Sequence, residues 1–574
     1  MSWIFGVIGQ QTAQDRQVFK RIHDRPLHVV QTRQHYIATG GIGETCFHSP
    51  ADDLTSGWLV CGVGIGRTSP HFSFLNQDDW DVVIQHLPEN LKELDGHFII
   101  LTWDTQGVYC HSDALGLRTL YVTKMDRFCA FSTRLDWIAQ IHPDCTLDLE
   151  VLGSAWLLMN QLSHQSLLKH TLRLGPGGSA TITPHSIKMT HRPWSYQQSQ
   201  TIVAADFADH LEELTIFPLK NQFPLSLALS GGLDSRVLLS ILLHANQPNW
   251  SVHSLHHPDN PDRMMAREIT ADLSVAHAFI EDLIPPVAKV PDLVREYLGH
   301  NLLTHGASSC FSLQFYNILY KQNKVVIDGG LGEICRRRYL NRINFRGEKL
   351  IINNDIALLR ALLSAKKAEI FTEEVGQKME EGARADIAAL LSVMPAVDEI
   401  GLNNWLDLMA IRTRFPNLAG FEQSRSDAYM VSYMPFAQSS LLHLLMNLPV
   451  SERRNGRLLR TIIRRNYKPL TRFPLVKDGV VYPYFLGALP ATLVIKLKKR
   501  LGLVYSDPLR EIFLNKIQAL VQDMVHSAAV KNCSYYKYSH ILQMVEGYYS
   551  GQKQWSRELD WWLTFEFWRQ GVKA

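Results

Sequence analysis

The residues with the clearest chemical potential are Ser230-Gly231-Gly232-Leu233-Asp234-Ser235. An apolar run at 224–229 precedes them and is typical of a buried parallel strand, and a second apolar run at 237–243 predicts the start of a helix. A helix N-terminus carries about half a positive charge, and glycine lets backbone N–H groups approach a ligand closely. This strand-to-helix turn therefore favours an anion, and the hydroxyls of Ser230 and Ser235 can donate hydrogen bonds to phosphate oxygens.

Asp234 would repel a phosphate unless a divalent cation lay between the two groups, so we interpret it as a Mg²⁺ ligand. No Gly-Lys-Ser/Thr follows the glycines, which excludes the common P-loop pattern. A surface turn rich in serine and glycine, without any ligand, is the alternative interpretation at this point, because short motifs also occur by chance.

The order strand, Ser-Gly-Gly-x-Asp-Ser, helix resembles the pyrophosphate-binding loop of ATP pyrophosphatases, which cleave ATP between the α and β phosphates. Within that group it is similar to the asparagine synthetase family. The resemblance implies a C-terminal parallel-sheet domain of the ATP-pyrophosphatase type with added helices, and ATP and Mg²⁺ as cofactors. In that family the end of the second strand, here 250–255, contacts the adenine. The predicted ATP-binding residues are Leu229, Ser230, Gly231, Gly232, Asp234, Ser235, Ser254, Leu255 and Gly330.

A second motif, Asp328-Gly329-Gly330-Leu331-Gly332-Glu333, ends another apolar run, 324–327. A carboxylate after a parallel strand lies at the edge where such sheets bind ligands. By the resemblance, Glu333 replaces the family's aspartate that shares Mg²⁺ with the loop aspartate, so Asp234 and Glu333 are the predicted metal ligands. Arg337-Arg338-Tyr339 stand where the family has Gly-Gly-Tyr. The arginines of 336–338 would bind pyrophosphate or an anionic substrate, or form an exposed face.

The segment 472–479 resembles the family's loop that brings a cation onto the leaving phosphates. Lys477 is the candidate cation that stabilises charge during adenylation or amide formation. Lys477 and Glu333 are thus the predicted catalytic residues. The alternative for Lys477 is an exposed loop lysine.

Residues 1–190 contain many short apolar runs separated by turn residues, which predicts layered hairpins. Leu94-Asp95-Gly96-His97-Phe98 and the segment 113–121 resemble class II glutamine amidotransferase domains. This implies a layered αββα domain like that of the N-terminal nucleophile hydrolases. Ser2 and Cys61, however, replace the family's nucleophilic cysteine and its oxyanion-hole asparagine. The domain is therefore either a structural relic, which the combined losses favour, or an amidase that uses Ser2.

The composition limits the partners and the location. The 574 residues carry a net charge of +3, which does not favour nucleic acid as a partner. The eight cysteines show no C-x-x-C pair, and we expect a reducing cytoplasm. The sequence contains no apolar run of about 18 residues, so we expect no membrane span. The basic stretch 494–503 predicts either a solvated helix face or a membrane-surface helix.

We expect an α/β protein with an inactive amidotransferase-like domain at 1–190 and an asparagine synthetase-like domain at 205–574, joined by a polar linker. Three functions remain open. The first is a ligase that adenylates the carboxylate of a small amino acid or peptide and passes it to ammonia. The second is a cyclase resembling β-lactam synthetases or lasso-peptide cyclases, with an amine within the substrate and a precursor peptide or partner protein. The third is a non-catalytic nucleotide-binding relic, against which the intact loop argues.

Overall fold

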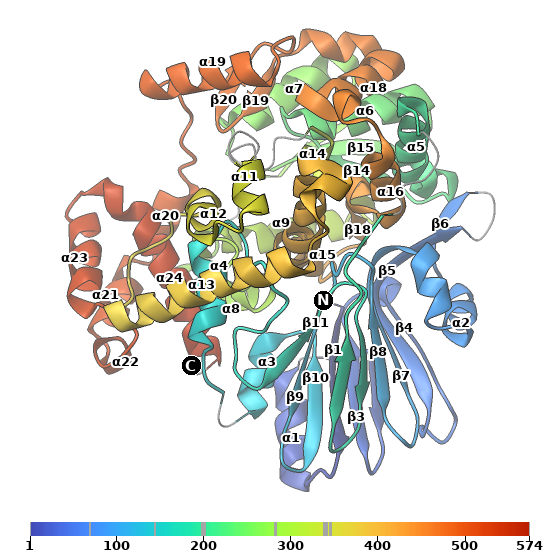
Figure 1. Cartoon of the computed structure of the whole chain (residues 1–574), viewed down its shortest axis with the longest axis vertical. Coiled ribbons are helices and arrows are strands. Elements are labelled where there is room, and N and C mark those ends of the chain that lie inside the picture. Colours follow the sequence, from blue (N-terminus) through green and yellow to red (C-terminus); the bar gives the residue numbers. More distant parts are fainter. Residues whose placement is uncertain are drawn as a thin grey trace.

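The computed structural model describes residues 2–23, 25–67, 71–142, 145–196, 202–255, 257–280, 284–336, 343 and 347–572. Two antiparallel sheets form the N-terminal domain (Figure 1). The first has the order β11 (Thr171–Leu174), β9 (Leu120–Lys124), β10 (Phe128–Ser132), β1 (Trp3–Gly9), β3 (His35–Gly40), β2 (His28–Gln31). The second has the order β13 (Ile187–Thr190), β12 (Ser179–Ile182), β8 (Val108–Ser112), β7 (Asp95–Trp103), β5 (Gly57–Arg67), β4 (Cys46–Pro50), with β6 (Phe72–Phe74) beside β5.

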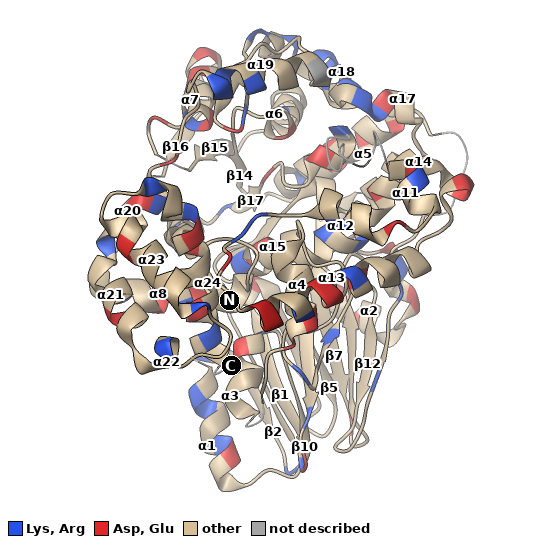
Figure 2. Ribbon diagram, turned by 60° about the vertical axis from the view of Figure 1, so that its left-hand side comes forward, with Lys and Arg blue, Asp and Glu red and all other residues tan. Residues whose placement is uncertain are grey.

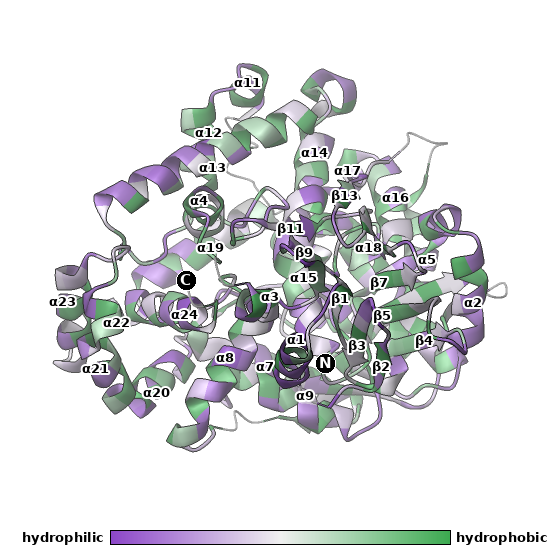
Figure 3. Ribbon diagram, turned by 90° about the horizontal axis from the view of Figure 1, so that it is seen from below, coloured by the Kyte–Doolittle hydropathy of each residue, from purple (hydrophilic) through white to green (hydrophobic). Residues whose placement is uncertain are grey.

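The strand β1 shows why the sheets stack. Its residues alternate, so that Ile4 and Ile8 face an apolar layer shared with the second sheet, while Phe5 and Val7 face the opposite side. Helices α1 (Ala13–Ile22) and α3 (Leu135–Ile141) cover that opposite side, and α2 (Gln77–Gln85) covers the far side of the second sheet. In Figure 3 the strands β5 and β7 are mostly hydrophobic, as expected between two layers. The predicted αββα arrangement is confirmed.

The C-terminal domain is built on a parallel five-stranded sheet in the order β16 (His277–Phe279), β15 (Trp250–Ser254), β14 (Leu225–Ala228), β17 (Val325–Ile327), β18 (Ser432–Tyr433). Helices connect the strands, as parallel pairing requires. They include α5 (Ala204–Lys220), α6 (Leu233–Ala245), α7 (Pro261–Leu273), α8 (Val290–Asn301) and α9 (Ser312–Tyr320). The predicted fold class, α/β with a parallel-sheet C-terminal domain, is confirmed.

The last helices return to the N-terminal domain. They are α20 (Leu509–Lys516), α21 (Gln518–His526), α22 (Ala528–Lys531), α23 (Tyr538–Tyr549) and α24 (Ser556–Val572). Their apolar residues share one core with α8, with α4 (Leu149–Leu157) and with the outer face of the first sheet. Apolar packing of these C-terminal helices therefore joins the two domains.

The basic stretch 494–503 is predicted to be either a solvated helix face or a membrane-surface helix. The basic stretch lies on α19 (Ala488–Arg500), whose cations are visible in Figure 2. Its Leu493 and Leu497 are 68% and 59% exposed, so both predictions for this surface stay open.

No helix in the described part of the chain combines the length and apolar character that a membrane crossing needs.

Ser2 stands where the resembled family has its nucleophilic cysteine. It lies near the centre of the molecule, where Figure 1 marks the N-terminus. Ser2 is fully buried, and its hydroxyl lies 3.2 Å from the carbonyl oxygen of Asp427, which belongs to the C-terminal domain. The Asp427 carboxylate lies 2.8 Å from both Arg118 Nη1 and His97 Nε2. Arg118 also donates to the Ser2 carbonyl and, over 2.9 Å, to the Cys61 sulfur. This burial supports the structural-relic interpretation of the N-terminal domain.

Replacing Asp427 with alanine is expected to lower the free energy of unfolding by about 3–5 kcal/mol, because it leaves the buried Arg118 without its carboxylate. Urea unfolding measures the effect. Asp292→Ala removes an exposed i,i+3 pair with Arg295 and should cost less than about 1 kcal/mol. Equal losses in the two variants would contradict the role given to Asp427.

Candidate functional site

The candidate site lies where the strand order of the parallel sheet reverses. From β14 the chain moves to β15 and β16 on one side, and later to β17 and β18 on the other. Open parallel sheets bind ligands in the crevice outside the carboxyl ends of the strands at such a switch point. The two predicted motifs, 230–235 after β14 and 328–333 after β17, both lie at this position.

The first motif forms a compact loop that continues into α6. The hydroxyls of Ser230 and Ser235 are 3.0 Å apart, and Ser235 Oγ accepts from the Ser230 amide over 3.2 Å. The Gly232 amide donates to Ser230 Oγ over 3.2 Å, and the Gly231 amide donates to Asp262 Oδ1 over 2.9 Å. The Gly231 amide thus donates to a carboxylate of the chain itself.

The second motif packs directly on the start of α6. A Cβ added to Gly329 would lie 2.6 Å from the Ser235 backbone nitrogen, and one added to Gly332 would lie 2.7 Å from Cβ and Cγ of Asp234. Only glycine fits at either position without moving one of the two loops. The glycines therefore explain how two loops almost 100 residues apart in sequence come to pack against each other.

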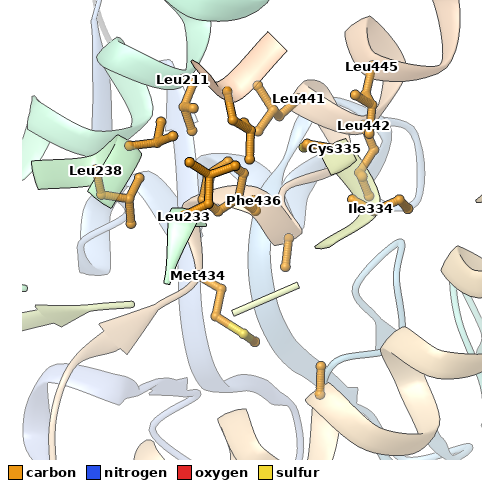
Figure 4. Close-up of a cluster of buried hydrophobic side chains, with 14 of the residues drawn as sticks. Leu211, Leu233, Leu238, Ile334, Cys335, Met434, Phe436, Leu441, Leu442 and Leu445 are labelled. Atoms are coloured by element: carbon orange, nitrogen blue, oxygen red, sulfur yellow. The ribbon is translucent and has the colours of Figure 1, made fainter. Parts of the chain in front are cut away.

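Buried apolar side chains hold both loops against the core. Leu233 immediately precedes Asp234, and Ile334 immediately follows Glu333; both are buried. Figure 4 shows them in one cluster with Phe436, which follows β18. Burying a side chain of this size contributes about 1.5–3 kcal/mol. The apolar cluster therefore anchors in the core the residues that adjoin Asp234 and Glu333.

Both predicted metal ligands form ion pairs in this structure. Asp234 pairs with Arg336, and Glu333 Oε1 lies 2.9 Å from Arg414 Nε. The described residues contain no group of three or more His, Cys, Asp or Glu side chains suited to a metal ion. Mg²⁺ is commonly held by one or two carboxylates together with substrate phosphates, and Asp234 and Glu333 lie on two loops that pack together. The residues present therefore fit Mg²⁺, and their role as its ligands stays a prediction.

The segment that carries Lys477 lies against the loop 230–235. The Val476 amide donates to the Gly231 carbonyl over 3.0 Å, and the buried Arg236 donates to the carbonyls of Phe473 and Pro474 over 2.7 and 2.8 Å. These bonds tie β19 (Leu475–Lys477) to the loop. The structure thus brings the backbone of Lys477 to the crevice, and its catalytic role remains a prediction.

The predicted nucleobase edge lies beside the same loop. Ser254 Oγ donates to the Leu229 carbonyl over 2.8 Å, and the Leu229 amide donates to the His253 carbonyl over 2.9 Å. Leu255 follows β15 and is half-buried. Gly330, on the other side, donates to Asp328 Oδ1 over 2.5 Å, and burial raises the pKa of Asp328 to about 6. The predicted binding residues therefore all lie on two adjoining loops and one strand end.

Sequence reasoning missed three residues of this site, namely Arg236, Asp262 and Arg414. Arg236 is a cation within an apolar helical run, which is itself a signal of a buried, specifically bonded side chain. Asp262 and the pairings of Arg336 and Arg414 with the carboxylates carry no local signal, because their partners are distant in sequence. The departure at 337–339 lies outside the described residues.

Comparisons with known proteins add little. No protein-family model matches the chain, and no curated protein matches it in sequence. A glutamine phosphoribosylpyrophosphate amidotransferase from B. subtilis, solved with ADP and GMP, aligns over 49% of this chain and 91% of its own, with 9% identity and a TM-score of 0.22.

Two further solved structures show similar values. An allosteric regulatory enzyme of purine biosynthesis aligns over 51% of this chain and 77% of its own, with 10% identity and a TM-score of 0.22. An NH3-dependent NAD synthetase from Campylobacter jejuni, solved with nitrate, aligns over 34% of this chain and 98% of its own, with 16% identity and a TM-score of 0.19. TM-scores this low carry no argument, so the site is judged on its own geometry.

Replacing Gly329 with alanine is expected to push the second motif away from α6, because the new Cβ would meet backbone atoms. We expect a loss of about 1–3 kcal/mol in the free energy of unfolding and a weaker affinity for ATP. Denaturant unfolding and calorimetric titration measure the two effects.

The matched control is Gly376→Ala on α13 (Glu373–Val393), where no atom lies within 4 Å of the added Cβ. It should stabilise the fold by roughly 0.5–1 kcal/mol and leave ATP affinity unchanged. Unaltered ATP affinity in Gly329→Ala would show that the contact between the two loops does not shape the site.

Proposed function

We propose that this protein is an ATP-dependent amide-forming ligase, similar to asparagine synthetases, that activates a carboxylate as an acyl-adenylate. The observation that carries the proposal is the meeting of two motifs at the switch point of the parallel sheet. One is a glycine- and serine-rich loop at a helix N-terminus, and the other packs its Gly332 against Asp234 and ends in the carboxylate of Glu333. Such a helix N-terminus binds phosphate groups readily.

In the proposed first step, an oxygen of the substrate carboxylate attacks the α-phosphorus of ATP. The bond from that phosphorus to the bridging oxygen breaks, and pyrophosphate leaves. The loop 230–235 holds the leaving pyrophosphate through its amides and hydroxyls. Asp234 and Glu333 would hold Mg²⁺, which when bound neutralises charge on the phosphate oxygens. In this proposal Lys477 stabilises the remaining negative charge.

In the second step, an amine nitrogen attacks the acyl carbon, the bond to the AMP oxygen breaks, and the amine loses a proton. Alignment of the two reactants supplies much of the rate gain, since effective molarity is worth roughly 7–11 kcal/mol. The amine is ammonia or an amine within the substrate.

A specific observation favours the second candidate function, cyclisation through an internal amine. Ser2 is fully buried beneath Asp427, so a glutamine molecule has no access to its hydroxyl. Ammonia would then have to come from solution or from a partner protein. An amine carried by the substrate itself, as in a macrolactam or β-lactam-forming cyclase, avoids this requirement.

The test is exchange of radiolabelled pyrophosphate into ATP with Mg²⁺, in the presence of aspartate or of peptides with acidic side chains. Exchange stimulated by one acid is expected, and Asp234→Asn should lower its rate by roughly a hundredfold or more. Asp292→Asn, at an exposed carboxylate, is the matched control and should retain the rate. ATP binding without exchange for any acid would favour the nucleotide-binding relic, and an undiminished rate in Asp234→Asn would contradict the assigned site.

A further inference from the structure

A cavity of about 150 Å³ lies between the two domains. Residues 155–167 of the N-terminal domain form one wall, and residues 302–304, 365–367 and 417–421, with two residues of α24, form the others. A space of this size holds a group about as large as benzene. The cavity can therefore take the end of a side chain or a small acid, but not a nucleotide.

The charged groups of this cavity all have the same sign. Lys366, Lys367 and Arg557 line it, and its lining contains no aspartate or glutamate. In the part of the chain that the structure describes, none of these three cations forms an ion pair with a carboxylate. The other polar side chains of the lining, such as those of Asn160 and Gln161, are uncharged. The cavity thus has an excess of positive charge.

Lys367 occupies the inner part of this arrangement. Its ammonium donates to the carbonyls of Ala155 and Leu303 over 2.7 and 3.0 Å, and lies 5.4 and 4.5 Å from the ring centres of Trp156 and Trp561. An ammonium has three N–H donors, so two carbonyls do not exhaust it. Burial, and then the nearby Arg557, lower the pKa of Lys367 to about 7. A buried charge of this kind is stabilised most by an opposite charge.

The cavity adjoins the proposed reaction site. Asn417 in its wall belongs to the same helical segment (Ala410–Ala419) as Arg414, which pairs with Glu333 over 2.9 Å. His305, next to Thr304 of the wall, lies 3.3 Å from Glu422 Oε1. The helical segments Ala410–Ala419 and Gly420–Ser426 follow each other directly, so one stretch carries Arg414 together with the wall residues Asn417 and Phe421.

We propose that this cavity binds a carboxylate of the substrate, in addition to the carboxylate that is activated. The inference rests on the proposed function, because it assigns a second acidic group of the same substrate to a cavity whose wall shares a helical segment with Arg414. It also gives the N-terminal domain a present use: residues 155–167 complete the substrate pocket although the Ser2 position is buried. The substrate class is then an acid with at least two carboxylates, either a small amino acid or a peptide with an acidic residue or a free C-terminus.

The test is equilibrium dialysis of the full-length protein with radiolabelled glutarate, and with its monoamide as the uncharged comparison. Glutarate should bind more tightly than the monoamide. Lys367→Met and Arg557→Gln should each weaken glutarate binding by about tenfold or more, since a hydrogen bond to a charged group is lost. Arg557 is exposed, so its variant tests the proposal even if Lys367→Met fails to fold.

Lys531→Met, at an exposed lysine of α22, is the matched control and should bind glutarate as the wild type does. Equal binding by all variants, or no glutarate binding at millimolar concentrations, would overturn the proposal. ATP binding measured in parallel separates the two hypotheses. Loss of glutarate affinity with intact ATP binding in the two variants supports the cavity, whereas glutarate binding by a wild type that binds no ATP contradicts the proposed function alone.

Discussion

The close contact between the turn 328–333 and the N-terminus of α6 is the constraint on which the candidate site depends. Two glycines, Gly329 and Gly332, allow the turn to lie against the backbone of Ser235 and the side chain of Asp234. Buried Leu233 and Ile334 secure the two loops on the apolar cluster below. A parallel sheet with a switch point brings any two such loops near each other, and this packing sets Gly332, the residue before Glu333, against the side chain of Asp234.

The charged side chains of the candidate site are paired with groups of the chain itself. Asp234 and Glu333 each pair with an arginine, and the Gly231 amide donates to the carboxylate of Asp262. These contacts satisfy groups that would otherwise be costly to bury. They also place Arg336 and Arg414 beside the position where pyrophosphate and an acidic substrate would lie, so the same cations can serve phosphates or carboxylates.

The strand-to-helix turn at 230–235 and the layered fold could be predicted from the sequence because their signals are local. Strand β14, the glycines and the apolar start of α6 follow one another without interruption, and the alternation along β1 marks its two faces. The burial of Ser2 under Asp427 could not be predicted, because the partner lies 425 residues away. The cation-lined cavity could not be predicted for the same reason, because Lys367 meets residues of α4 and α24 only in the folded chain.

The most direct test of the central claim is a crystal structure with Mg²⁺ and an ATP analogue whose α–β bridging oxygen is a methylene group. We expect its phosphates against the amides and hydroxyls of 230–235, with the metal between them and the carboxylates of Asp234 and Glu333. Phosphates at any other position, or a carboxylate pair that still contacts only Arg336 and Arg414 with the analogue bound, would contradict the account.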